Sequence, residues 1–180
     1  MAPELMETER LLLRVEHEDA AARVLDLYLR NRDEFEAYEP TRPEGFYTED
    51  FHRQVLRREY NMYLSEQFLR YHLYFKEQPE YCVGSLNFNI RNDGNVFCEI
   101  GYKIEHTLWN QGIATEAVVA GIEIMQDYYP ITRVDARILG TNKKSRHLVK
   151  KLGFVFMCEE PQSANILGKD VDITRYTLAL

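Results

Sequence analysis

The middle of the chain contains a predicted strand that leads through a glycine turn into a predicted helix. Residues 96–104 alternate with a period of two, so that one face is apolar and the other carries Glu99 and Lys103. Residues 114–125 place small and apolar side chains along one narrow helical stripe. Between them, Gly112 lets the backbone come close to a ligand, and the free N–H groups of the following helix favour an anion there. The segment therefore predicts a pyrophosphate-binding turn, although an ordinary strand–helix connection explains the same residues equally well.

Length and composition predict a single soluble domain over residues 1–180, with 45% hydrophobic and 28% charged residues. No apolar run is long enough to span a membrane, and the N-terminus has no signal-peptide pattern, so we expect a cytoplasmic protein. The net charge of −7 argues against general nucleic-acid binding. It suits a cationic acceptor such as an amine, although the same charge simply keeps many proteins soluble.

Cysteine and histidine positions predict neither a disulfide framework nor a metal site. The three cysteines, Cys82, Cys98 and Cys158, are odd in number and widely spaced, which favours a reducing compartment. The five histidines show no ligand spacing and no arrangement typical of a catalytic triad.

Periodicity and chain-breaking residues place the remaining elements. Residues 8–14 predict an opening strand, residues 19–30 predict an amphipathic helix, and Thr48 is a predicted N-cap of a helix that reaches about Phe68. Pro130 is expected to end the central helix. Further strands are predicted at residues 71–75, 83–90, 132–139 and 170–180, with a hairpin turn at 92–95.

Residues 31–47 combine acidic and aromatic side chains with two prolines and a glycine in their second half. Tyr38, Glu39 and Phe46 can line the mouth of a site for a cationic group. A surface loop held in place by aromatic packing is an equally good interpretation.

Residues 139–154 form a second segment with chemical potential. Thr141 or Asn142 can cap a helix there, and Gly153 fits the left-handed residue that closes it. The cations on this helix predict a solvated face, or in an acidic chain a place to hold phosphate.

Two motifs make the chain similar to the GCN5-related N-acetyltransferase (GNAT) superfamily. Its acyl-CoA loop has the pattern Arg/Gln-x-x-Gly-x-Gly/Ala, in which Gly112 and Ala114 fill the last two defined positions. Trp109 stands at the first position, as in the RimJ/RimL-like branch of ribosomal-protein N-terminal acetyltransferases, and Asn110 replaces a common glycine. The second motif is Asn-x-x-Ser-x-x-Leu-x-x-Lys-x-Gly-Phe, and it is matched by Asn142, Ser145, Leu148, Lys151, Gly153 and Phe154.

This resemblance implies a mixed α/β fold and acetyl-CoA as the cofactor. We expect a strongly bent, mostly antiparallel sheet of about seven strands, with helices on both faces and a split where the cofactor enters. Asn142 is then expected to hydrogen-bond the pantetheine arm. The predicted cofactor-binding residues are Tyr102, Lys103, Ile104, Trp109, Asn110, Gln111, Gly112, Ile113, Ala114, Thr115, Asn142 and Ser145.

Two side chains are predicted to catalyse the transfer. Glu99 is the candidate base that deprotonates the amine, directly or through water, because alternation places it opposite the apolar face; a purely structural role is the alternative. The resemblance implies Ser145 as the acid, since Val149 stands where many members of the superfamily have a tyrosine. A backbone N–H of residues 102–104 is expected to stabilise the developing oxyanion. Glu116, in the first turn of the central helix, is interpreted as structural.

The resemblance implies transfer of an acetyl group to a protein N-terminal amine, with Tyr38, Glu39 and Phe46 on the acceptor side and a monomer or homodimer as the assembly. Alternatives are a small-molecule amine acetyltransferase, a non-catalytic acyl-CoA-binding module, and a ribosome-associated factor that uses its basic helix at residues 143–151. The branch often has Gly-x-Trp-x-Asp near the last strand. Here Gly168 and Asp172 match while Asp170 replaces the tryptophan, which leaves the acceptor open.

Overall fold

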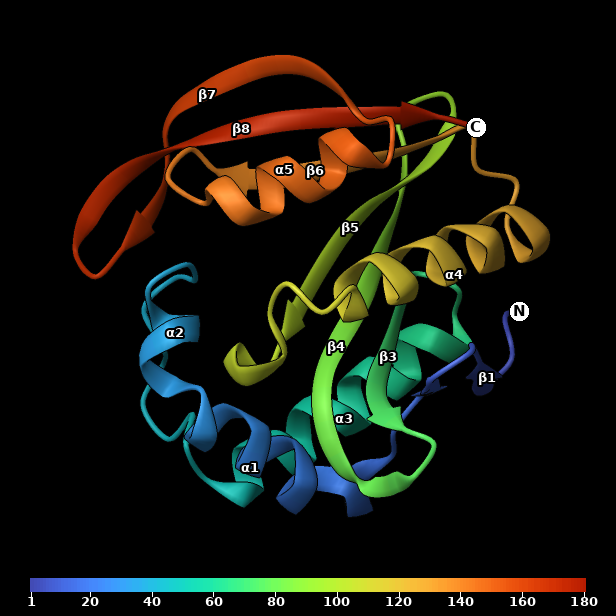
Figure 1. Cartoon of the computed structure of the whole chain (residues 1–180), viewed down its shortest axis with the longest axis vertical. Coiled ribbons are helices and arrows are strands. Elements are labelled where there is room, and N and C mark those ends of the chain that lie inside the picture. Colours follow the sequence, from blue (N-terminus) through green and yellow to red (C-terminus); the bar gives the residue numbers. More distant parts are fainter.

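All strands of the protein belong to one sheet, whose order is β1-β2-β3-β4-β5-β6-β8-β7 (Figure 1). The structure is a computed structural model that describes residues 1–180. Only the β5–β6 pair is parallel, and the other neighbours are antiparallel. The strands are β1 Leu5–Glu7, β2 Leu11–Arg14, β3 Phe68–Phe75, β4 Gln78–Asn92, β5 Val96–Ile104, β6 Arg133–Leu139, β7 Val155–Ile166 and β8 Lys169–Ala179.

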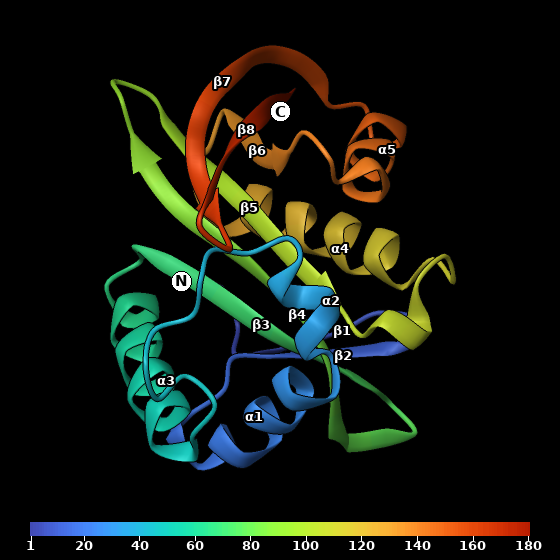
Figure 2. The ribbon, with the colours of Figure 1, turned by 90° about the vertical axis from the view of Figure 1, so that its left-hand side faces the viewer.

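Helices cover both faces of this sheet, as expected (Figure 2). Helices α1 (Ala21–Arg30) and α3 (Glu49–Leu64) lie on one face, while α4 (Ile113–Tyr128) and α5 (Lys143–Lys151) lie on the other. The short helix α2 (Arg32–Glu36) follows α1 directly, and short 3-10 turns occupy Glu18–Ala20 and His106–Leu108. None of these helices combines the length and apolar character needed to cross a membrane.

Small residues on α4 let this helix approach the sheet closely. A Cβ atom added at Gly121 would lie 2.4 Å from Leu86 Cδ2 and 2.8 Å from Phe88 Cζ, both on β4. Ala117 and Val118 are fully buried on the same stripe. The pattern that predicted the helix thus also fixes its packing distance, because a larger residue at the contact would force the helix away from the strand.

Thr48 caps α3 as predicted, since its Oγ1 accepts a hydrogen bond of 3.3 Å from the backbone N–H of Phe51. The helix ends at Leu64 rather than near Phe68, which instead begins β3.

The predicted opening strand at residues 8–14 is wrong in its first half. Two strands, β1 and β2, flank a turn at Thr8, in which the Thr8 N–H donates to the Leu11 carbonyl over 2.9 Å. The sheet therefore has eight strands instead of about seven. Strand β7 was also not predicted, because residues 155–166 are mostly exposed and include a proline. Pairing with β8 is what keeps this segment extended.

The parallel pair β5–β6 diverges soon after it forms. Its register joins only Cys98–Ile100 to Val134–Ala136. Beyond Ile100 the two strands keep their outer neighbours, β4 and β8, but no longer bond to each other. Backbone groups on the inner edges of both strands thus face a gap, into which a linear, amide-bearing ligand could insert.

Strand β6 carries a buried carboxylate. Asp135 is 1% exposed, and it accepts hydrogen bonds of 2.7 Å from both Arg175 and Thr177. Burial of this charge is possible because β8 supplies its hydrogen-bonding partners.

Candidate active site

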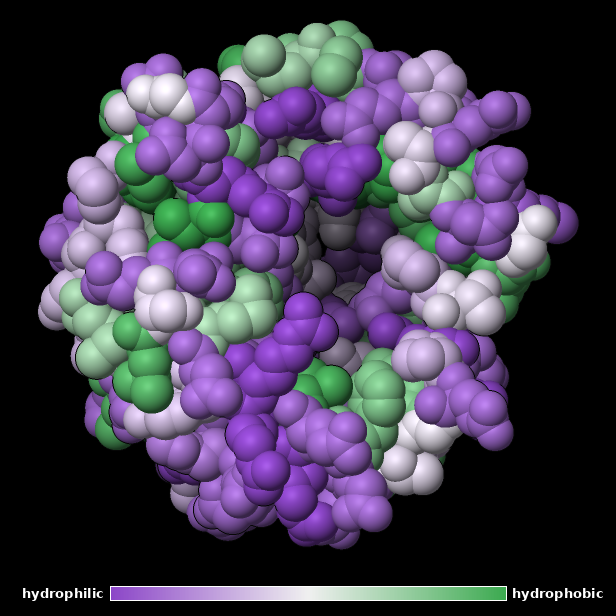
Figure 3. Space-filling model, turned by 180° about the vertical axis from the view of Figure 1, so that it is seen from behind, coloured by the Kyte–Doolittle hydropathy of each residue, from purple (hydrophilic) through white to green (hydrophobic).

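The gap between β5 and β6 opens into a cavity of about 980 Å³, visible from behind as a hollow with a largely hydrophilic rim (Figure 3). Its walls come from the ends of the two strands, the turn before α4, helix α5, the α2 region and the β7–β8 hairpin. All predicted cofactor-binding residues except Gln111 line this cavity: Tyr102, Lys103, Ile104, Trp109, Asn110, Gly112, Ile113, Ala114, Thr115, Asn142 and Ser145.

The glycine turn leaves the start of α4 open. Gly112, its N-cap residue, has a φ of 80°, and no side chain caps the helix. Asn110 also adopts a positive φ of 62°, which asparagine tolerates better than most residues and which explains how it can stand where glycine is common. The first N–H groups of α4 are therefore available to an anion. Lys144 Nζ lies 3.8 Å above the Trp109 ring at the same wall and adds positive charge. These residues fit the pyrophosphate of a coenzyme A molecule.

Glu116 anchors the first turn of α4 to the N-terminal segment. Its carboxylate accepts hydrogen bonds from Thr8 Oγ1 at 2.5 Å, from the Arg10 backbone N–H at 2.8 Å and from Arg10 Nε at 2.6 Å. Burial raises the pKa of Glu116, but these hydrogen bonds and the Arg10 charge outweigh it and lower that pKa below its usual value. Glu116 is thus structural, as interpreted from its position, and it ties the cofactor turn to the start of the sheet.

Helix α5 presents the second motif to the cavity. Asn142 caps the helix through its Oδ1, which accepts a 3.1 Å hydrogen bond from the Ser145 backbone N–H, so its amide Nδ2 remains available as a donor. Ser145 is half-buried, and its carbonyl oxygen accepts a 3.4 Å hydrogen bond from Tyr102 Oη. Val149 is fully buried, so no polar group reaches the cavity from that position.

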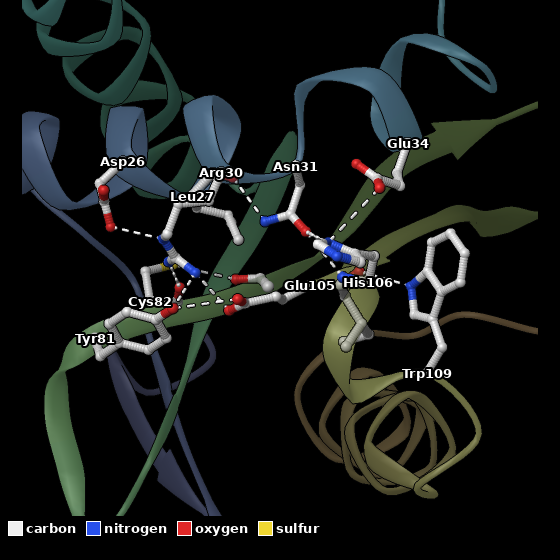
Figure 4. Close-up of polar contacts among 12 residues, drawn as sticks. Asp26, Leu27, Arg30, Asn31, Glu34, Tyr81, Cys82, Glu105, His106 and Trp109 are labelled. Atoms are coloured by element: carbon white, nitrogen blue, oxygen red, sulfur yellow. Dashed lines mark hydrogen bonds and ion pairs between the residues drawn. The ribbon is translucent and has the colours of Figure 1, made fainter.

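A polar cluster joins the α1–α2 region to the segment between β5 and α4 (Figure 4). Asn31 is fully buried: its Nδ2 donates to the Leu27 carbonyl, and its Oδ1 accepts from the backbone N–H of His106 over 2.8 Å. Beside it, the Arg30 guanidinium lies 2.5 Å from Glu105 Oε2. The cluster holds α2 against the end of β5, so both walls of the cavity are joined here.

The α2 wall carries the two acidic side chains that line the cavity, Glu34 and Glu39. Glu34 Oε1 lies 3.9 Å from His106 Nδ1, whereas Glu39 is paired with both Lys103 and Arg42. Burial raises the pKa of Glu39, but the charges of Lys103 and Arg42 outweigh it and lower that pKa below its usual value. Glu39 therefore stays ionised and paired with two cations, whereas the carboxylate of Glu34 has only the contact with His106.

Three predicted site residues do not line the cavity. Glu99 lies beside Asp135 in the β5–β6 register, one residue before the strands diverge. The Gln111 side chain is turned away, and its Nε2 donates a 2.8 Å hydrogen bond to the Thr107 carbonyl oxygen. Phe46 is 7% exposed and packs against Tyr28, with ring centroids 5.0 Å apart. Phe46 thus packs behind the cavity, in line with the interpretation of its loop as held by aromatic packing. Tyr38 and Glu39 reach the cavity.

Sequence reasoning missed several lining residues. Glu34, Arg137 and residues 163–166 of the β7–β8 hairpin all face the cavity. Figures 1 and 2 place that hairpin tip close to the α2 region, although the two are far apart in the chain. Glu34 lies within the acidic and aromatic segment 31–47 but was not singled out there. No local pattern marked Arg137 or residues 163–166, because their placement depends on how the sheet closes around the gap.

Comparison with known proteins identifies the fold and the family. The family model described as "Acetyltransferase (GNAT) domain" matches residues 10–155. The chain is 30% identical over 149 residues to the [ribosomal protein uS5]-alanine N-acetyltransferase of Escherichia coli, covering 82% of this chain and 76% of that protein.

Solved structures agree with this assignment. The ribosomal-protein-S5-alanine acetyltransferase from Vibrio fischeri superposes with a TM-score of 0.90 at 22% identity, covering 97% of this chain and 96% of that one. RimL, a ribosomal L7/L12 α-N-protein acetyltransferase solved with coenzyme A, gives a TM-score of 0.88 at 18% identity over 98% of both chains. The chain therefore belongs to the GNAT family of acetyltransferases and is an acetyl-CoA-dependent N-acetyltransferase.

Proposed function

We propose that this protein acetylates the N-terminal α-amine of a protein, with a ribosomal protein as the first candidate class. The observation that carries the proposal is the continuity of one cavity, which runs from the cofactor turn at Gly112 to a separate wall formed by α2 and the β7–β8 hairpin. That second wall is not needed for the cofactor and leaves room for the end of a polypeptide. The relatives named for ribosomal-protein acetylation support the acceptor class.

Different residues around the gap bind the cofactor and assist departure of the leaving group. Bound acetyl-CoA supplies an activated thioester for attack by an amine. The N-terminus of α4 and Lys144 would hold its phosphates, and Asn142 Nδ2 would donate a hydrogen bond to its pantetheine arm. The Ser145 hydroxyl, which lines the cavity, would donate a proton or a hydrogen bond to the departing sulfur.

The acceptor ammonium must lose a proton before it can attack. Glu34 is the best-placed base, because it lines the cavity and has only a 3.9 Å contact with His106. Glu39 is a poor base because two cations hold it. The sequence-based candidate Glu99 lies outside the lining, so a role for it requires an intervening water.

The basic helix α5 favours cofactor binding over a ribosome contact. Lys143, Lys144 and Lys151 line the cavity, and all three are also exposed to solvent. The ribosome-associated factor considered from the sequence stays the alternative, and it predicts ribosome binding that weakens sharply with salt.

The test is acetyl transfer followed by mass spectrometry. Acetyl-CoA is offered with a pool of N-terminal peptides and, separately, with a pool of polyamines, amino acids and aminoglycosides. Product confined to peptide N-termini is the expected result. Product only among the small amines would replace the protein-modifying function by a metabolite or resistance function. Absence of product in both pools, with acetyl-CoA binding demonstrated, would support a non-catalytic binding module.

A further inference from the structure

Two cations share one carboxylate at the acceptor end of the cavity. Lys103 Nζ lies 2.7 Å from Glu39 Oε1 and 2.9 Å from Tyr28 Oη, and Arg42 pairs with the other oxygen of Glu39. The side chains of Lys103 and Arg42 are only 16% and 15% exposed. The cluster therefore carries a net positive charge in a largely desolvated place.

Of the neighbouring carboxylates, Glu36 feels the charge of Arg42, whereas none but Glu39 pairs with Lys103. Behind the cluster, the fully buried Arg70 has its own partner in Glu59 at 2.9 Å. His52 is stacked on Tyr28, and burial together with the charges of Arg42 and Lys103 lowers the pKa of His52 to about 4. A buried histidine held neutral beside the cluster is consistent with a positive local potential.

Lys103 and Arg42 also keep unused hydrogen-bond donors. An ammonium group has three N–H donors, and two of those on Lys103 have partners, Glu39 and Tyr28. The buried Nε of Arg42 has none. Lys103 lines the cavity, so an incoming ligand can approach its ammonium group. A purely structural ion pair with Glu39 would need only one cation and no spare donor. A second cation and an unpaired donor would only add a cost to such a pair, because unpaired buried charge is costly.

We propose that Lys103 binds a carboxylate of the acceptor, so that the preferred acceptor is a peptide with an aspartate or glutamate side chain close to its N-terminal amine. The inference rests on the proposed function and narrows its substrate class. This preference for an acidic peptide is the opposite of what the overall charge suggests, since a net charge of −7 repels acidic peptides at long range. At contact distance the desolvated Lys103 outweighs that repulsion, because local charges in a water-poor site are screened far less.

The test uses two peptides that share an N-terminal alanine and differ only by glutamate or glutamine at the second and third positions. Each is measured for kcat/KM with acetyl-CoA, and for its dissociation constant by fluorescence anisotropy with non-acetylated CoA present, so that binding is seen without turnover. The wild-type protein is compared with Lys103→Met, and with Lys76→Met as a matched control on a surface lysine paired with Glu7. Thermal unfolding checks that each variant is folded.

The expected result is about tenfold or more tighter binding and faster acetylation of the acidic peptide by the wild type, the size of a charge-assisted hydrogen bond. Lys103→Met should abolish this preference, so that the acidic and neutral peptides bind equally, and Lys76→Met should keep it. Equal binding of the two peptides by the wild type overturns the inference and needs no variant. A preference that survives Lys103→Met overturns it as well. Tight, Lys103-dependent binding without acetylation would instead remove the proposed function and leave the carboxylate site standing.

Discussion

The side-chain oxygen of Asn31 accepts two hydrogen bonds from His106, one from its backbone N–H over 2.8 Å and one from its Nδ1 over 2.9 Å (Figure 4). An amide oxygen can only accept, so the His106 ring carries a hydrogen on Nδ1. Asn31 lies between α1 and α2, and His106 begins the turn that leads to the cofactor loop. One buried amide thus joins the cavity wall formed by α2 to the wall formed by the turn before α4.

Removing this amide should loosen both walls together. Asn31→Ala leaves the His106 N–H buried without a partner, which should cost about 2–3 kcal/mol in the free energy of unfolding, measured by urea denaturation. The KM values for acetyl-CoA and for the acceptor peptide should both rise. Asn61→Ala, on the exposed face of α3, is the control and should change neither the free energy of unfolding nor the two KM values. A destabilised Asn31→Ala protein with both KM values unchanged would show that the contact does not couple the walls.

Substitution of Gly112 should weaken cofactor binding beyond its effect on stability. A φ of 80° strains any residue with a side chain, so Gly112→Ala should lose about 1 kcal/mol of stability. Its dissociation constant for acetyl-CoA, measured by calorimetry, should rise because the turn at α4 shifts. Gly94→Ala is the matched control: φ is 105° there, in a hairpin turn outside the cavity. It should lose similar stability and bind acetyl-CoA normally. Equal effects on binding would contradict the assignment of the turn.

Glu116 should contribute stability that is lost in acid. Because its folded pKa is lowered below the usual value of 4.5, its contribution is present above that pH and disappears as the pH falls through the folded pKa. At neutral pH, Glu116→Gln should destabilise the protein by about 1–2 kcal/mol, a modest figure because Arg10 is partly exposed. The difference from the wild type should shrink below about pH 4.5 in unfolding curves recorded against pH. Glu123→Gln, exposed on α4, should show no such dependence.

Ser145 should affect turnover more than binding. If its hydroxyl assists the departing sulfur, Ser145→Ala should lower kcat about 100-fold and leave the KM for acetyl-CoA nearly unchanged. Ser65→Ala, at the exposed end of α3, provides the control in steady-state assays. A normal kcat for Ser145→Ala would remove the serine from the mechanism.

The proton acceptor can be identified from the pH profile. Without its base, the enzyme depends on amine that is already neutral, and an N-terminal α-amine has a pKa of about 8. Glu34→Gln should therefore lower kcat/KM at neutral pH about 100-fold and recover much of it near about pH 9. The same assay on Glu99→Gln is expected to show a smaller loss, because Glu99 lies outside the cavity lining. The reverse ranking would return the role to Glu99 acting through water.

Local sequence signals predicted the strand and helix around Gly112 and the caps of two helices. The strand at 96–104, the helix after Gly112 and the caps at Thr48 and Asn142 each depend on contacts within a few residues. Periodicity and capping chemistry report such contacts directly, which is why these predictions were confirmed. Strand β7 escaped prediction because it is mostly exposed and is held in place by distant partners, above all by pairing with β8.

The amino-acid sequence by itself determined the elements around Gly112: a strand, a glycine turn and two helix N-termini whose free or capped N–H groups follow from local backbone geometry. Only the tertiary structure decided the opposite wall of the cavity. It brought Lys103 to Tyr28, which is 75 residues away, and placed Glu34 and the β7–β8 hairpin on one cavity. The physical reason is that strand divergence after Ile100 and the pairing of distant charges depend on how whole elements pack, and no local pattern encodes that packing.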